Sequence, residues 1–156
     1  MAARAEGYLL GRQEMTHAMG GIDMIEARVA QEIFVTAPNR VGLLAQVTEA
    51  IAGAGVDIYA IAAYEKDGRG EFMIVTSDND SATTALANII NMSVERKDVV
   101  MLDLPAEPGS LARASAKLAH ENIDIRWIYG TAGDARRVSL VLRVADPFGA
   151  VKILNS

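Results

Sequence analysis

Apolar and polar positions follow the same order twice along this chain, and each cycle predicts alternating strands and helices. In the first cycle, residues 32–36 are rich in β-branched side chains and predict a strand, and residues 38–42 predict a turn. A second strand at 57–62 and a return strand at 72–75 are joined by a tight hairpin at Asp67-Gly68. Between turn and second strand, helical spacing predicts an amphipathic helix with the apolar face Leu44, Val47, Ile51 and Ala54.

The rest of the first cycle predicts a second helix and a short last strand. Asp78 precedes a polar run that is typical of a helix N-terminus, where its carboxylate accepts hydrogen bonds from free backbone N–H groups. Val94 then opens the fourth strand of the cycle. The side chains that we expect the second helix to bury are Ala85, Leu86, Ile89 and Ile90.

The second cycle predicts the same elements in the same order. Strands are expected at 99–104, 123–129 and 138–144, with a turn at 105–110 and a hairpin at 132–134. The two helices begin at the turn and at Asp146-Pro147, and their expected apolar faces are Leu111, Ala114, Ser115 and Leu118, then Phe148, Val151 and Leu154. Together the cycles predict an α+β fold, βαββαβ twice, with an antiparallel sheet and both helices of each unit on one face.

A shift of 67 residues aligns the two cycles and indicates that they are copies of one unit. Within residues 38–61, 8 of 24 positions are identical after the shift. The identical pairs are Pro38 and Pro105, Gly42 and Gly109, Leu44 and Leu111, Ala45 and Ala112, Ala52 and Ala119, Asp57 and Asp124, Ile58 and Ile125, and Ile61 and Ile128. The repeat is too long for a solenoid and fits a duplicated small α+β domain.

The second copy is shorter than the first. It stops at Ser156, near the position that matches residue 88, so its sequence contains no fourth strand. Either the second copy is truncated at its C-terminus, or its open sheet edge is paired by another segment, for which the candidates are residues 24–30 of this chain and a neighbouring chain. Because the two copies are joined without a linker, we expect a rigid pair. The predicted division is an N-terminal arm at 1–30, partly disordered, a first domain at 31–98 and a second domain at 99–156.

Composition excludes several classes of function. The net charge of −5 and the pI near 5.0 argue against nucleic acid as a partner. Cysteine is absent and there are two histidines, which excludes disulfides, thiolate nucleophiles and cysteine-ligated metals. No apolar run is long enough to cross a membrane and no signal peptide is visible, so we expect a cytoplasmic protein without a membrane partner. No catalytic motif is found, and we expect no enzyme, no metal and no cofactor.

Two stretches resemble the opening of an ACT domain: residues 33–44, IFVTAPNRVGLL, and residues 104–112, LPAEPGSLA. The pattern of that family is a strand, then a polar residue, two further positions, a glycine and an apolar helix start. Asn122-Ile123-Asp124-Ile125 is similar to the entry of that family into its second strand. The resemblance spans about residues 31–156. It implies a stand-alone tandem ACT protein with two ferredoxin-like units, the second lacking its last strand, and no fused enzyme.

The two strand-to-helix loops have the chemistry to bind a carboxylate. A helix N-terminus leaves backbone N–H groups unpaired and partly positive, and a glycine lets a ligand approach closely. The resemblance implies that an amino acid binds at these loops between paired domains, with strand-end carbonyls or Asp57 and Asp124 near its ammonium group. The predicted ligand-binding residues are Asn39, Arg40, Val41, Gly42, Leu43, Asp57 and Ile58 in the first copy, and Glu107, Pro108, Gly109, Ser110, Leu111, Asn122, Ile123 and Asp124 in the second.

Purely structural roles stay open for several of these residues. The glycines serve the turn alone in that interpretation, Asp57 and Asp124 are turn residues, and Asn39 only caps its helix.

Three hypotheses about function remain. The first is a non-catalytic regulatory sensor that binds a small molecule, most simply an amino acid. The alternative is a structural or partner-binding module that has kept the fold and lost the pocket. RNA recognition modules share the βαββαβ order, but only Phe34 and Phe72 of the first copy are placed to stack bases, which disfavours RNA. Both the resemblance and the unpaired edge favour a homodimer.

Overall fold

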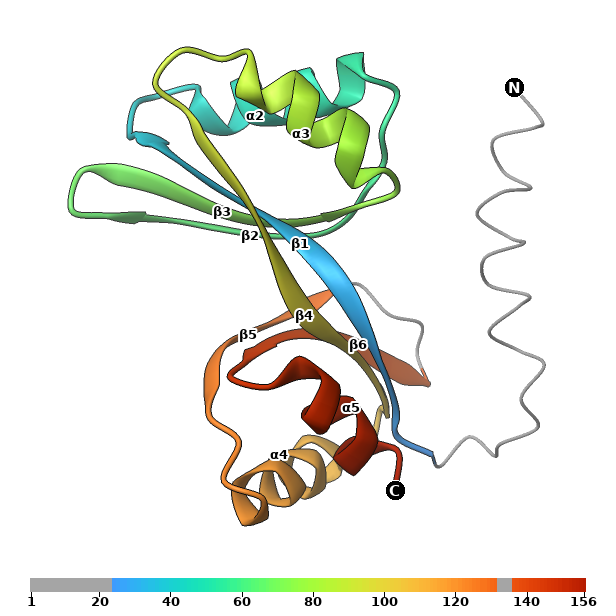
Figure 1. Cartoon of the computed structure of the whole chain (residues 1–156). Helices are drawn as coiled ribbons and strands as arrows, with labels where there is room; N and C mark the ends of the chain where they lie inside the picture. Colours follow the sequence, from blue (N-terminus) through green and yellow to red (C-terminus); the bar gives the residue numbers. More distant parts are fainter. Residues whose placement is uncertain (1–23, 132–135) are drawn as a thin grey trace, which may run out of the picture.

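The structure is a computed structural model that describes residues 24–131 and 136–156. The predicted hairpin at 132–134 and the first 23 residues lie outside the described residues. The elements are β1 (Glu26–Pro38), α2 (Leu43–Gly53), β2 (Ile58–Lys66), β3 (Arg69–Thr76), α3 (Asn79–Ala87), β4 (Ser93–Pro105), α4 (Ser110–His120), β5 (Ile125–Thr131), β6 (Arg137–Val144) and α5 (Pro147–Leu154). This order confirms the repeated βαββαβ pattern, which Figure 1 shows as an upper and a lower unit.

The two units share their two longest strands. All strands belong to one antiparallel sheet with the order β2-β3-β1-β4-β6-β5. Residues 31–36 of β1 pair with 93–98 of β4 in the first unit. Residues 26–30 of β1 pair with 99–103 of β4 in the second unit. Each unit therefore has four strands, and β1 and β4 both cross the boundaries expected from the sequence.

The missing fourth strand of the second unit comes from the start of this same chain. Glu26 lies opposite Asp103 and Ala30 lies opposite Val99, on the side of β4 away from β6. The side chain of Asn155, directly after α5, holds the outer edge of this segment: Ala27 N–H donates to Asn155 Oδ1 and Asn155 Nδ2 donates to Ala27 O, both at 2.8 Å. Of the two candidates for the open edge, the intramolecular one is present.

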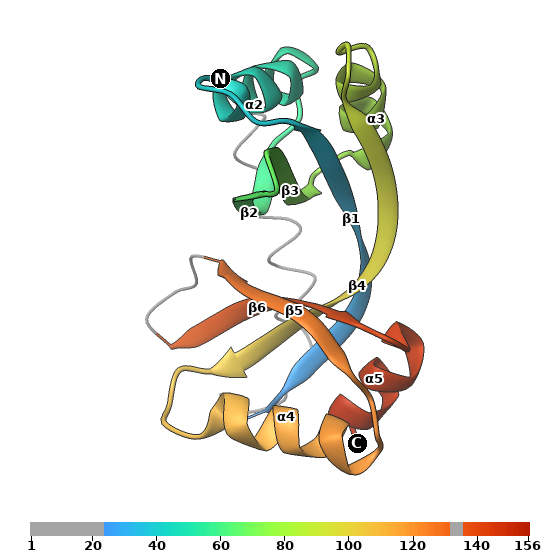
Figure 2. The ribbon, with the colours of Figure 1, turned by 90° about the vertical axis from the view of Figure 1, so that its left-hand side faces the viewer.

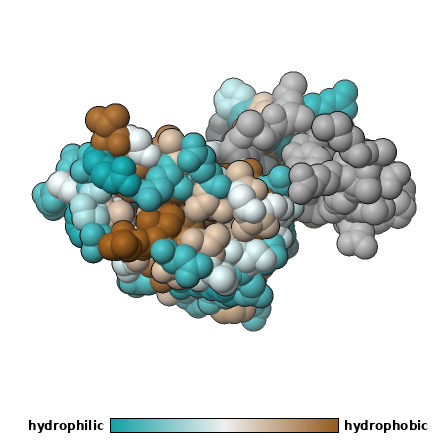
Figure 3. Space-filling model, turned by 90° about the horizontal axis from the view of Figure 1, so that it is seen from above, coloured by the Kyte–Doolittle hydropathy of each residue, from teal (hydrophilic) through white to brown (hydrophobic). Residues whose placement is uncertain are grey.

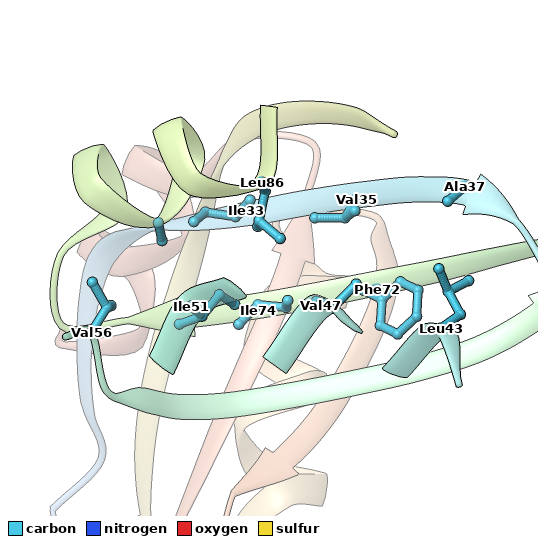
Figure 4. Packing of buried hydrophobic residues seen from close by; sticks show 11 residues of the cluster. Ile33, Val35, Ala37, Leu43, Val47, Ile51, Val56, Phe72, Ile74 and Leu86 are labelled. Atoms are coloured by element: carbon cyan, nitrogen blue, oxygen red, sulfur yellow. The ribbon is translucent and has the colours of Figure 1, made fainter. Parts of the chain in front are cut away.

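The helices lie on the outside and the sheet lies between them. In Figures 1 and 2, α2 and α3 cover the outer face of the first unit, while α4 and α5 cover the outer face of the second. Each helix pair encloses its own apolar core. Figure 4 shows the first core, where Val47 and Ile51 of α2 point onto Ile33 and Ile74 of the sheet. A third cluster joins the inner faces of the two sheet halves and consists of Ala60, Val75, Val99, Met101 and Val141.

Local capping signals were predicted correctly. Asp78 precedes α3 and accepts hydrogen bonds from the N–H groups of Asp80 and Ser81. Asp146 precedes α5 and accepts from Gly149 N–H, with a proline at the first helical position. The carboxylates satisfy N–H groups that the first helical turn leaves free.

Several predicted apolar faces are wrong in detail. Ile90 is 86% exposed because α3 already ends at Ala87, so Ile90 lies in a loop. Phe148 is 68% exposed because α5 buries Ala150 and Leu154, which are about half a turn away from it. Leu44 and Leu111, one position after the inward-facing residues of α2 and α4, and Ala54, the residue after α2, are exposed as well.

Candidate functional site

The two predicted loops have one geometry. Gly42 and Gly109 immediately precede α2 and α4, with φ of 86° and 89°. This left-handed conformation favours glycine, since other side chains are strained there. In the described part of the chain no side chain caps either helix, so the expectation that Asn39 caps α2 is wrong. The first turn of each helix therefore has backbone N–H groups that no capping side chain satisfies, and such groups can bind a carboxylate.

The loop of the first unit is open. Asn39 N–H donates to the carbonyl of Gly68 at 2.8 Å, which ties the loop to the β2–β3 hairpin. Arg40 bonds Gln46 within α2, and Val41 is fully exposed. A Cβ atom added at Gly42 would meet no atom within 4 Å, so free space adjoins the start of the helix. Figure 3 looks onto this helical side, and apolar atoms gather on its left, the side on which both the β1–α2 loop and the α3–β4 loop lie in Figure 1.

Leu43, the last predicted residue of this loop, has a different role. Its side chain is 4% exposed and belongs to the first core. It packs over Gly70 of β3, where an added Cβ would come within 2.6 Å of Leu43 Cδ2. Leu43 thus anchors α2 on the hairpin, which leaves the preceding positions of the loop to face a ligand.

The loop of the second unit is occupied by its own side chains. Glu107 forms an ion pair with Arg113 of α4, and Arg113 Nη2 donates to Ser110 Oγ at 3.2 Å. A Cβ added at Gly109 would lie 3.4 Å from Arg113 Nη1. Ser110 is buried, whereas Pro108 and Leu111 are exposed. The two loops share their backbone shape, but only that of the first unit offers open space at the helix start.

The other predicted residues lie at the far ends of α2 and α4. In β1–β3 pairing Pro38 is opposite Arg69, while Ile58 of β2 is opposite Thr76 at the other end of β3. The carbonyl of Asp57 accepts from Ser77 N–H at 2.9 Å. Asp57 and Ile58 therefore do not meet the loop at residues 39–43 within one unit.

The second unit repeats this separation. The carbonyl of Asp124 accepts from Ala145 N–H at 3.1 Å, and Asn122 has a φ of 59° in the turn after α4. Ile123 is half-buried against the second core. Glu107 to Leu111 lie at the opposite end of α4, and in Figures 1 and 2 they are also far from the loop of the first unit. Within each unit, the predicted loop residues and the predicted residues around Asp57 or Asp124 therefore lie at opposite ends of the helix.

The sequence interpretation missed a polar cluster between the units. Glu32 of β1 is fully buried, and its Oε2 accepts from the hydroxyl group of Tyr129 in β5 at 2.7 Å. The Phe34 and Trp127 rings stack with centroids 6.0 Å apart. The ammonium group of Lys97 lies 4.1 Å from the Phe34 ring centroid. These side chains project from the inner face of the sheet, so that residues from both units meet there.

Burial controls the titration of this cluster. Loss of water raises the pKa of Glu32 above its usual value of 4.5. Tyr129 and Trp127 lower it, as do the charges of Arg143 and Lys97, but their combined effect is smaller. Burial, and then the neighbouring Glu32 carboxylate, raise the pKa of Tyr129. The signal in the sequence was a charge in a strand whose alternate residues, Ala30 and Phe34, are apolar.

The structure also bears on the RNA hypothesis and on metals. Phe72 is 4% exposed inside the first core and Phe34 is stacked against Trp127, so neither ring offers a free face for a base. Among the described residues no group of acidic or histidine side chains is arranged to hold a metal ion. None of the described helices is long and apolar enough to cross a membrane.

Comparison with known families agrees with the resemblance seen in the first loop motif. A model of the ACT domain family matches residues 31–91, within the first unit. The second unit repeats the first in sequence and in fold, so the whole described chain resembles two ACT domains in tandem. No curated protein matches the sequence.

Solved structures share the fold of this chain. Protein BT0572 from Bacteroides thetaiotaomicron is 28% identical, with a TM-score of 0.75 over 82% of this chain and 88% of its own. The ligand-free regulatory subunit of aspartate kinase from Thermus thermophilus is 18% identical, with a TM-score of 0.61 over 83% and 93%. The corresponding subunit from Thermus flavus is 16% identical, with a TM-score of 0.59 over 86% and 97%. At these identities the two kinase subunits establish similarity of fold.

Proposed function

We propose that this tandem ACT protein is a non-catalytic regulatory module that binds an amino acid at the loop between β1 and α2. The observation that carries the proposal is the uncapped start of α2 at Gly42, beside open space. The ACT family match and the fold shared with regulatory subunits of aspartate kinase support a regulatory role.

The chemistry of the loop favours a carboxylate. In the part of the chain that the structure describes, no partner is found for the N–H groups of Leu44 and Ala45. They lie at the positive end of the α2 dipole, which attracts an anion. The second unit has the same backbone, but Arg113 and Glu107 cover its helix start. We therefore assign the ligand to the first unit.

A homodimer would complete this site. An amino acid also carries an ammonium group, and the predicted acceptors near Asp57 lie at the far end of α2. A second copy packed antiparallel along α2 and β2 would bring its own Asp57 to the loop. The repeat supports this surface: Leu44 and Ile61 are 51% and 37% exposed, and their equivalents Leu111 and Ile128 are 44% and 42% exposed. The open edge that first favoured a dimer is closed within the chain and supports it no longer.

A thermal-shift screen with the common amino acids tests the proposed binding. A ligand at 100 times its Kd adds about 2.7 kcal/mol to the free energy of unfolding and raises Tm by several degrees. Gly42→Asn should abolish the shift, because it places a side chain beside the free N–H groups in a conformation that Asn tolerates. Gly68→Asn is the matched control, since Gly68 has a φ of 76° and equally open space. Equal shifts in both variants would contradict the proposed site.

The oligomeric state, taken together with amino-acid binding, distinguishes the sensor hypothesis from the hypothesis of a partner-binding module. Light scattering should give about twice 16.6 kDa for the wild type, and Leu44→Lys should return it to the monomer mass. A dimer that binds no amino acid would favour the partner-binding alternative.

A further inference from the structure

The repeat relates the inner faces of the two units by an approximate two-fold axis at the middle of the long strands. In the β1–β4 pairing Gln31 lies opposite Asp98, and these two positions are equivalent under the 67-residue shift. The register of β2 on β3 shifts after Ile58, and that of β5 on β6 shifts after the equivalent Ile125. Each side chain on the inner face of one unit therefore has a counterpart on the inner face of the other.

The second unit carries rings on its inner face where the first unit carries methyl groups. Trp127 and Tyr129 of β5 both project toward β1 of the first unit. The equivalent positions of β2 are Ala60 and Ala62. Ala60 belongs to the third apolar cluster and Tyr129 packs against that cluster, where the two outermost strands of the sheet come into contact. One face is small where the other is large.

The positions that receive these side chains have diverged as well. The Tyr129 hydroxyl group donates to Glu32 Oε2 at 2.7 Å, and the neighbouring tryptophan ring of β5 stacks on Phe34. The counterparts of Glu32 and Phe34 in the second unit are Val99 and Met101, by the same shift. Both counterparts are buried members of the third apolar cluster. One half of the interface is therefore aromatic and polar, and its symmetric half is apolar.

The carboxylate of Glu32 depends on a donor from the other unit. Its side chain is fully buried, and its second oxygen, Oε1, has no hydrogen-bond partner among the described residues. A buried carboxylate without a donor is strongly disfavoured, and so is a buried hydroxyl group without an acceptor. The first unit supplies the acceptor and Tyr129 of the second unit supplies the donor, so two identical faces would lack one of them.

We infer that the two inner faces are matched but unlike surfaces, so that the first unit pairs with the second and neither unit pairs with its own kind. Two first-unit faces would bury two carboxylates opposite alanine and leave voids in place of the rings. Two second-unit faces would crowd additional rings into one space and bury two hydroxyl groups opposite valine. A second copy of the chain is then left with the outer surfaces to bind. The inference does not depend on amino-acid binding, because the proposed ligand loop lies at the end of β1.

Exchange of the two faces tests this pairing rule in the full-length chain. Tyr129→Ala with Val99→Glu gives both units the first-unit pattern, and Glu32→Val with Ala62→Tyr gives both the second-unit pattern. Each double variant should lower the urea midpoint by roughly 1 M, because each buries polar groups without partners. All four substitutions together move the carboxylate and its donor to the symmetric position and should recover most of this loss.

An uncharged exchange provides the independent arm. Ala60→Trp should lower the urea midpoint by crowding the interface, and Trp127→Ala should lower it by leaving a cavity. The two together restore one ring and one small residue and should recover most of the loss. This arm decides the matter if a variant with Val99→Glu does not fold. Additive losses in the uncharged arm, or in the charged arm when all its variants fold, would overturn the pairing rule.

Discussion

Asn155→Ala should release the edge of the second unit at a measurable cost. The Asn155 side chain makes two hydrogen bonds of 2.8 Å to the backbone of Ala27, which lies 128 positions earlier in the chain. A hydrogen bond contributes about 0.5–1.5 kcal/mol net, and water replaces part of it at this exposed site. We therefore expect a loss of about 1–2 kcal/mol, which lowers Tm by roughly 3–6 °C in a chain of this length.

The assay pairs calorimetry with amide hydrogen exchange. Asn88→Ala is the matched control, because Asn88 follows α3 as Asn155 follows α5, and no side-chain hydrogen bond is found for it among the described residues. Exchange should quicken at Ala27 in Asn155→Ala and stay unchanged in Asn88→Ala. Equal Tm values and equal protection of Ala27 in the two variants would show that the Asn155 side chain does not hold Ala27 in place.

Two further predictions concern the shared strand and the first core. Deletion of residues 1–30 removes the fourth strand of the second unit and bares the edge of β4, so it should lower Tm and produce aggregates in size-exclusion chromatography; an unchanged Tm and elution volume would contradict this. Ile51→Ala should cost about 2–5 kcal/mol in urea unfolding, because Ile51 is fully buried. The control Glu49→Ala, on the exposed side of the same helix, should cost less than about 0.5 kcal/mol; similar losses would mean that α2 does not pack as described.

Features set by nearby residues were predicted well. The turn glycines, the Asp78 and Asp146 caps and the Asp67-Gly68 hairpin each depend on a few consecutive residues, and the structure shows all of them. The 67-residue repeat then extended these local signals to a whole fold, because one unit supports the interpretation of the other.

Helix faces were predicted less well, because spacing alone does not locate the end of a helix. The apolar run in the first copy continues to Ile90, but α3 ends at Ala87 and the helical phase ends with it. In α4 the buried positions are Ser110, Ala114 and Leu118, and the larger Leu111 misled the prediction.

Contacts between segments that are distant in the sequence could not be predicted from the sequence. Glu32 and Tyr129 are 97 positions apart, and a charge in a strand is normally a sign of a solvent-facing side. The second unit covers that side. The division of the predicted ligand residues between opposite ends of each unit also follows from strand register, which hydrophobic spacing does not specify.

The shared strands impose an order on synthesis. Residues 31–98 contain every strand of the first unit, so this unit has its full set of partners while the second is still being translated. Residues 26–30 leave the ribosome before residues 31–98 and have no strand partner until Val99 to Asp103 emerge. The hydrogen bonds from Asn155 to Ala27 form only when the last residues of the chain have been made. The segment that is synthesised first is therefore the last to be held in place, and until then it must not pair with a strand of the first unit, which is already complete.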